Sequence, residues 1–81
     1  MKRRNLAQLN EESGIIANVV RNNRKKLGYS QYEFSQRVGI GLRFLKELEE
    51  GKKSLRMDKV EQVLNFLGYT LHPQVIKRNH E

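Results

Sequence analysis

Arginine and lysine side chains are the groups in this sequence best placed to make specific contacts. Arg43 and Lys46 lie three residues apart, which puts them on one face of a helix, with Glu47 beside them. The planar guanidinium of Arg43 can donate to guanine O6 and N7 together, with a solvated surface arginine as the alternative, and Lys46 can reach a base or a phosphate. Glu47 could accept from a cytosine amine, although pairing with Arg43 is favoured. These residue types indicate binding to a polyanion rather than catalysis.

The residue types that catalysis and metal binding need are sparse. His72 and His80 are the two histidines, Asp58 is the single aspartate, and cysteine is absent. No His, Asp or Glu group has the spacing of metal ligands on one helix face. Ser30 has no nearby base that could activate its hydroxyl. We therefore expect a protein that is not an enzyme and that needs no metal and no cofactor.

Charge and composition agree with a small binding domain. The chain has 81 residues and a formal charge of +7, of which Lys2, Arg3 and Arg4 contribute +3. Residues 11–72 hold eleven basic against eight acidic side chains, so the predicted folded part is only mildly basic. No apolar run approaches the ~20 residues that span a membrane, and the absence of cysteine suits a reducing compartment. The expectation is a soluble, cytoplasmic protein of one domain without a membrane contact.

A short helix precedes the Arg43 region in the pattern. Ser30 followed by Glu33 is a capping box, which predicts a helix that begins at Gln31. Phe34 and Val38 lie four residues apart and would share its buried face.

The next helix carries Arg43 and is separated from the first by a glycine turn. Gly39 can adopt a positive φ, which ends one helix and turns the chain. Leu45 and Leu48 would face inward on the second helix, and Gly51 would close it. Two helices joined in this way can place the second one in the DNA major groove. The same geometry also occurs in small helical bundles, so the pattern alone leaves both interpretations open.

Two further helices complete the predicted domain, over residues 12–27 and 57–66. Gly28 would end the first of them, and Gly68 would cap the second in the left-handed conformation. Their apolar residues at helical spacing are Ile15, Ile16, Val19, Val20 and Leu27, and then Val60, Val63, Leu64 and Leu67.

The residues after Gly68 change in character. Tyr69, Thr70, Leu71 and His72 favour an extended strand, which Pro73 would end. Its backbone groups need hydrogen-bond partners that a helical chain does not supply. Pairing with a second copy would provide them and would bury Leu71 with parts of Val63 and Leu67. An extended, frayed tail is the alternative.

The sequence from about residue 16 to 71 resembles the lambda-repressor-like (XRE/Cro-type) helix-turn-helix family. The resemblance rests on several linked pieces at the right mutual spacing: Arg24-Lys25-Lys26-Leu27-Gly28, Ser30-Gln31 with Glu33, Val38-Gly39-Ile40 and Leu48-Glu49-Glu50-Gly51-Lys52. It implies an all-α, four-helix DNA-binding domain over residues 11–72. A flexible basic arm (1–10) would precede this domain, and a flexible tail (73–81) would follow it.

Within this family the chain looks most like the HipB-type antitoxins. The pieces concerned are Gly39-Ile40-Gly41-Leu42-Arg43-Phe44, Leu55-Arg56-Met57-Asp58-Lys59-Val60 and Leu67-Gly68-Tyr69-Thr70-Leu71. This likeness implies a homodimer joined by a two-stranded sheet at Tyr69–His72. It also implies a repressor of an inverted-repeat operator in its own promoter that neutralises a HipA-type serine/threonine kinase. A stand-alone or phage-type regulator without a toxin partner is the alternative.

The resemblance also assigns roles to single residues. The positions that face base edges are Gly41, Leu42, Arg43, Lys46 and Glu47. Phosphate contacts are expected from Gln31, Arg37, Lys52 and Lys53, although Lys52 and Lys53 could equally form a solvated loop. The arm at Lys2–Arg4 could enter a minor groove or make no contact.

Two positions depart from the family pattern, and one pair is expected to be structural. Gly41 stands where many members have Ser or Thr, and Leu42 where many have a polar side chain, so thymine-methyl contacts and DNA shape should carry part of the specificity. Arg24 and Glu49 match a salt bridge that recurs in repressor-type domains.

Overall fold

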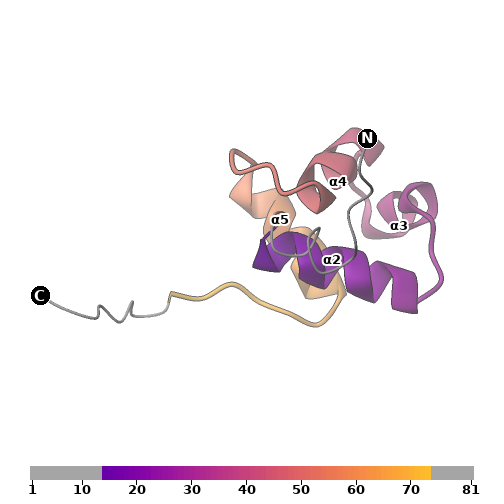
Figure 1. Cartoon of the computed structure of the whole chain (residues 1–81), viewed down its shortest axis with the longest axis horizontal. Coiled ribbons are helices and arrows are strands. Elements are labelled where there is room, and N and C mark those ends of the chain that lie inside the picture. Colours follow the sequence, from indigo (N-terminus) through magenta and orange to yellow (C-terminus); the bar gives the residue numbers. More distant parts are fainter. Residues whose placement is uncertain (1–13, 74–81) are drawn as a thin grey trace, which may run out of the picture.

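The computed structural model describes residues 14–73, so the arm at 1–10 and residues 74–81 of the predicted tail lie outside it. Four helices follow one another in this part: α2 (Ile15–Lys26), α3 (Gln31–Val38), α4 (Leu42–Glu49) and α5 (Met57–Phe66) (Figure 1). No strand is present between residues 14 and 73, in agreement with an all-α domain. Within the same residues, none of the helices is both long and apolar enough to cross a membrane.

The first described helix differs from its prediction at both ends. Gly14 is the N-cap of α2 and has φ 89°, so the helix begins at Ile15 rather than at residue 12. Ala17, Val20 and Arg24 form its buried face. Ile15 belongs to the apolar set at helical spacing, yet it is 81% exposed, because it lies two residues, or about 200° of helical turn, from the buried Ala17. Leu27 is also exposed, since it follows the last turn of α2.

The structure confirms the predicted bounds of α3. Ser30 Oγ accepts from the Glu33 backbone N–H at 3.0 Å, and Glu33 Oε1 accepts from the Ser30 backbone N–H at 2.9 Å. The capping box therefore satisfies two backbone donors that would otherwise lack partners at the helix start. Gly39 ends α3 with φ 87°, and Phe34 and Val38 are buried.

Helices α4 and α5 also follow the predicted pattern. Leu45 and Leu48 are buried on the inner side of α4, and the Gly51 N–H donates to the Leu48 carbonyl just beyond the helix. Helix α5 begins and ends at the predicted residues, and Gly68 follows it with φ 89°.

The core is centred on Phe34, which is fully buried. The Phe66 ring meets it edge to face, with centroids 5.6 Å apart, and the Tyr29 ring lies 6.2 Å away. All four helices contribute buried aliphatic side chains around it: Val20, Val38, Leu45, Leu48, Val60, Val63 and Leu64. This shared core sets the orientation of α3 and α4 relative to each other.

Residues 69–73 leave the domain in a conformation without regular secondary structure (Figure 1). The Tyr69 N–H donates to the Leu64 carbonyl at 2.8 Å, which closes the end of α5. Leu71 packs against the core and is half-buried. Val63 is fully buried within one chain, so the expectation that it lies between two copies is wrong. Strand pairing requires a second copy and stays a prediction.

Candidate DNA-binding surface

The outer side of α4 presents the predicted base-contacting residues to solvent. Gly41, Arg43 and Lys46 are exposed, and Leu42 and Glu47 are half-buried. The Arg43 side chain is 93% exposed. Gly41 caps α4 in an extended conformation, and a Cβ placed there would meet no atom within 4 Å. A partner can therefore approach the start of α4 closely.

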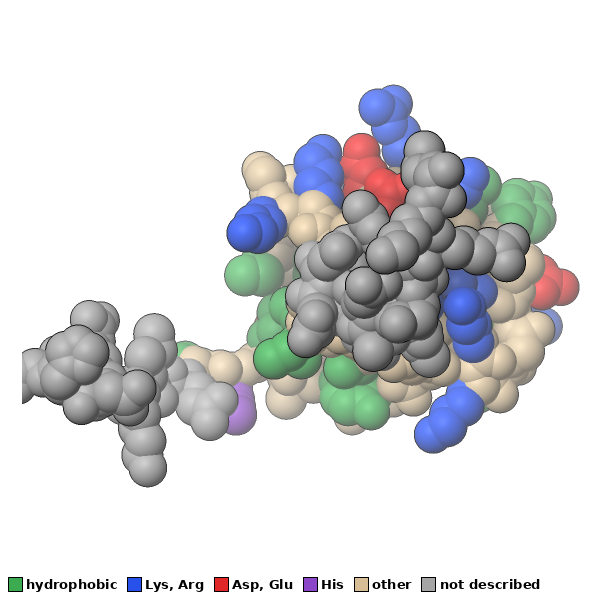
Figure 2. All heavy atoms as spheres, in the orientation of Figure 1, with side chains coloured by type: hydrophobic (Ala, Val, Ile, Leu, Met, Phe, Trp, Pro, Cys, Tyr) green, Lys and Arg blue, Asp and Glu red, His purple; other side chains and the backbone are tan. Residues whose placement is uncertain are grey.

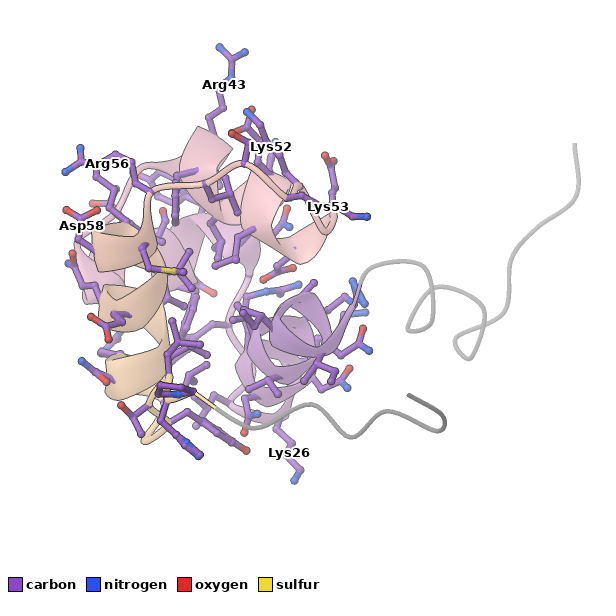
Figure 3. All side chains as sticks on the ribbon, turned by 90° about the vertical axis from the view of Figure 1, so that its left-hand side faces the viewer. Lys26, Arg43, Lys52, Lys53, Arg56 and Asp58 are labelled. Carbon is purple, nitrogen blue, oxygen red and sulfur yellow. The ribbon has the colours of Figure 1, made fainter. Side chains whose placement is uncertain are left out.

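Glu47 lies between two cations on this surface. Its Oε2 is 3.7 Å from Arg43 Nε, and its Oε1 is 3.4 Å from Lys52 Nζ. Exposed pairs of this kind contribute only ~0–1 kcal/mol, so a nucleic acid could displace them at little cost. The pairing of Glu47 with Arg43 that the sequence favours is present, and the Arg43 side chain points away from the domain (Figure 3).

Basic side chains gather on the side of the domain where α4 lies. Arg43, Lys52, Lys53 and Arg56 all lie toward this side, whereas Lys26 points away on the opposite side (Figure 3). On the face drawn in Figure 2, Lys and Arg side chains are spread along the margin, with acidic groups between some of them. We call Arg43, Lys52, Lys53 and Arg56 the basic face.

Arg56 is the member of the basic face that the sequence analysis did not single out as a DNA contact. Its guanidinium pairs with Asp58 Oδ2 at 2.7 Å, and both side chains are largely exposed. The hydrogen bond from Arg56 holds the pKa of Asp58 below its ordinary value. The position of Arg56 relative to α4 depends on the path of the loop between α4 and α5. No local sequence signal predicts that path.

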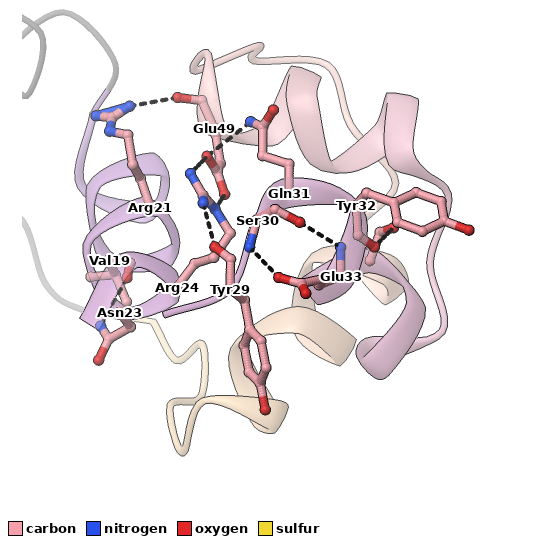
Figure 4. Close-up of polar contacts among 11 residues, drawn as sticks. Val19, Arg21, Asn23, Arg24, Tyr29, Ser30, Gln31, Tyr32, Glu33 and Glu49 are labelled. Carbon is pink, nitrogen blue, oxygen red and sulfur yellow. Dashed lines mark hydrogen bonds and ion pairs between the residues drawn. The ribbon is translucent and has the colours of Figure 1, made fainter. Parts of the chain in front are cut away.

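The inner side of α4 is fixed to α2 through Glu49 (Figure 4). Arg24 Nε and Nη2 donate to the two carboxylate oxygens of Glu49 at 2.7 and 3.0 Å, so the pair that the resemblance implies is bidentate. The Glu49 side chain is only 3% exposed. Arg21 Nη1 also donates to the backbone carbonyl of Glu49 at 2.7 Å. Two arginines of α2 therefore hold the end of α4.

Gln31 and Arg37, both predicted to contact phosphate, have contacts within the domain. Gln31 Nε2 donates to Glu49 Oε1 at 3.1 Å, which links the start of α3 to the same carboxylate. An amide nitrogen has a second hydrogen, so this bond leaves Gln31 one donor. The Arg37 guanidinium lies 5.0 Å from the centre of the Tyr29 ring. That contact joins Arg37 to the aromatic cluster rather than to the basic face.

The turn between α3 and α4 has a clamp that the sequence analysis missed. Gln62 Nε2 on α5 donates to the Val38 carbonyl at 2.9 Å and lies 3.5 Å from that of Gly39. These carbonyls belong to the end of α3, where backbone acceptors lack helical partners. A residue 24 positions away thus joins α5 to the turn between α3 and α4.

Two short helices joined by a fixed glycine turn, with a basic outer side on the second helix, define a helix-turn-helix protein. The family model described as "Helix-turn-helix" matches residues 20–73, and the chain belongs to this family. The chain is also similar to the uncharacterized HTH-type transcriptional regulator y4mF of Sinorhizobium fredii. The two are 41% identical over 56 residues, which cover 69% of this chain and 74% of that protein.

Proposed function

We propose that this protein is a sequence-specific, double-stranded DNA-binding repressor that places α4 in the major groove. The observation that carries the proposal is the division of α4 into two sides. Its inner side is fixed by Leu45, Leu48 and Glu49, and its outer side presents Arg43 almost fully to solvent. A helix mounted in this way can enter a groove without any loss of core contacts.

The roles of single residues in this proposal follow from their places on the surface. Arg43 would donate to a guanine, and Lys46 would reach a base or phosphate from the next turn. Leu42 would contact a thymine methyl, the bare Gly41 would allow close approach, and Glu47 would orient Arg43. The phosphate contacts would come from Lys52, Lys53 and Arg56, together with the remaining donor of Gln31. Arg37 has the weakest support, since its guanidinium stacks on Tyr29.

Arg43→Ala tests the proposal directly. The substitution removes a guanidinium that contributes little to the fold, so we expect loss of ~1–3 kcal/mol in operator binding and an unchanged unfolding curve. Fluorescence anisotropy with DNA from the promoter of its own gene measures the affinity. Lys26→Ala is the matched control, because Lys26 is an exposed basic residue on the opposite side (Figure 3). Equal affinities for the two variants would exclude the proposed role of Arg43.

A homodimer is the form in which we propose that the protein binds DNA. Two copies related by a two-fold axis can contact an inverted repeat with α4 of each copy. The segment Tyr69–His72 supports this arrangement, because no backbone hydrogen bond joins residues 70–72 to another described segment. Exposed Leu27, Phe66 and Tyr69 add apolar surface for an interface.

The likeness to HipB-type antitoxins supports a narrower role. In this role the dimer would repress its own operon and also hold a HipA-type serine/threonine kinase inactive. Co-expression with a kinase encoded in the adjacent reading frame provides the test, with growth and co-purification as readouts. Rescue of growth by the wild type supports the antitoxin role. A neighbourhood without such a kinase, or a kinase that remains toxic, would favour a stand-alone or phage-type regulator.

A further inference from the structure

An apolar groove lies between the start of α2, the start of α5 and the loop before α5. Its volume is about 730 Å³, and its apolar lining includes Ile15, Ile16, Leu48, Leu55 and Met57. Ile15 is 81% exposed and Met57 is 65% exposed. Large apolar side chains gathered at one solvent-facing hollow mark a candidate interaction site. The groove opens next to the basic face, because Lys52 and Lys53 also line it, but its apolar side chains have no role in the proposed DNA contacts.

We propose that the segment of this chain before Gly14 fills the groove, with Leu6 and Leu9 as its anchors. Gly14 itself lines the groove, so residues 1–13 join the described domain at the edge of the site. Leu9 lies five residues before Gly14 and can reach ~17 Å from it in an extended conformation. Leu6 and Leu9 are the two large aliphatic residues between Met1 and Gly14.

The charges of the segment before Gly14 and of the groove support the same placement. Lys52 and Lys53 line the groove together with Gly14. Glu11 and Glu12 stand immediately before Ser13 and Gly14 in the sequence. Two acidic residues at this point can face the two lysines, and they also suit the positive end of the α2 dipole. The segment therefore offers apolar groups for the hollow and acidic groups for its basic rim.

Covalent connection favours this segment over a second copy of the chain as the occupant. A short tether gives the attached segment an effective concentration of the order of millimolar at the groove. A second copy at micromolar concentration would have to bind roughly a thousandfold more tightly to compete.

Disulfide formation provides the test, since the chain contains no cysteine. We would combine Gln8→Cys with Met57→Cys in the full chain, which leaves both leucine anchors intact. A disulfide requires the two Cβ atoms to come within ~3.5–4.5 Å. The expected result is an intramolecular disulfide whose rate falls at least tenfold when Leu6→Ser and Leu9→Ser are added. Asn5→Ser is the matched control and should leave the rate unchanged.

Two outcomes of the disulfide experiment would overturn the proposal. Equal rates with and without the leucines would show that the tether alone brings the cysteines together. A disulfide that forms mainly between chains would assign the groove to a second copy. A measurement on the unsubstituted chain adds an independent check that does not depend on the folding of a variant. Leu9 methyl protons should show nuclear Overhauser contacts to Ile16 or Met57, and their absence would exclude docking.

Discussion

Among single residues, Glu49 connects three helices behind the candidate DNA-binding surface. Its carboxylate accepts from Arg24 and Gln31, and its backbone carbonyl accepts from Arg21. The side chain is buried, so its charge depends on these donors for compensation. One residue thereby connects α2, α3 and the end of the helix that carries Arg43.

Removal of the Glu49 charge should destabilise the domain far more than removal of a surface pair. Glu49→Gln would leave the Arg24 guanidinium buried without a counter-charge, at a cost of roughly 3 kcal/mol in unfolding free energy. The double variant Arg24→Met with Glu49→Leu should recover most of this loss, because apolar groups of similar volume need no compensation. Urea unfolding measures both. A single variant within 1 kcal/mol of wild type would show that the pair does not clamp the helices.

At the scale of elements, α3 depends on its capping box for a defined start. The Ser30 backbone N–H and side chain hydrogen-bond to Glu33, and the backbone bond is the main reason why the pKa of Glu33 is lowered from its ordinary value of 4.5. The charged form of Glu33 is therefore the one that the fold stabilises. Its contribution is complete above the unfolded-state pKa and disappears as the pH falls through the lower folded-state pKa.

The capping box predicts a pH-dependent difference between wild type and Glu33→Gln. A glutamine keeps an acceptor at this position but carries no charge. The stability advantage of the wild type should be constant near neutral pH and should shrink as the pH falls below ~4.5. Thermal unfolding at several pH values between 3 and 7 would measure it. Glu61→Gln on the exposed side of α5 controls for the loss of one negative charge, and an advantage that grew toward pH 3 would contradict the assignment.

The elements differ in how far local sequence determines them. Helices α3 and α5 were predicted at both ends, because their start and stop signals lie within a few residues of each bound. Helix α2 was predicted to begin three residues too early, since the apolar pattern does not show that Gly14 is its N-cap. The sequence analysis missed the hydrogen bond from Gln62 to the end of α3 and the placement of Arg56 on the same side of the domain as α4. Both depend on packing between segments that are distant in the sequence. The Arg24–Glu49 pair came from family resemblance, not from residue spacing.

At the scale of the whole molecule, the contacts with DNA should depend strongly on salt. Binding by Lys52, Lys53 and Arg56 would release counterions, with log K falling by ~0.9 per phosphate contact for each unit of log salt. Lys53→Ala should weaken binding to all sequences and reduce this slope by about one, whereas Lys26→Ala should leave it unchanged. Affinity titrations between 50 and 200 mM salt would test this. A flat response of the wild type would argue against DNA as the ligand.

Assembly is the second property of the whole molecule that can be tested. A helix-turn-helix dimer needs its two recognition helices ~34–36 Å apart, which the proposed pairing of Tyr69–His72 would fix. Thr70→Pro removes a backbone donor from that segment, and truncation after Gly68 removes the segment entirely. Both changes should weaken the dimer and operator binding while the helical domain stays folded. Thr70→Ser is the control, and sedimentation at micromolar concentration measures the association. If all forms were equally dimeric, the interface would have to lie on helix faces.

The two sides of α4 differ in what a mutation would change. Substitutions at Leu45, Leu48 or Glu49 would disturb the core or the buried ion pair, so selection should remove them. Substitutions at Arg43 or Lys46 would leave those contacts intact and change only the surface that α4 presents. After gene duplication, two copies of this chain could therefore acquire different operators without passing through an unstable intermediate. Because different sides of α4 contact the core and, in our proposal, the DNA, the DNA specificity of the protein could evolve separately from the stability of its fold.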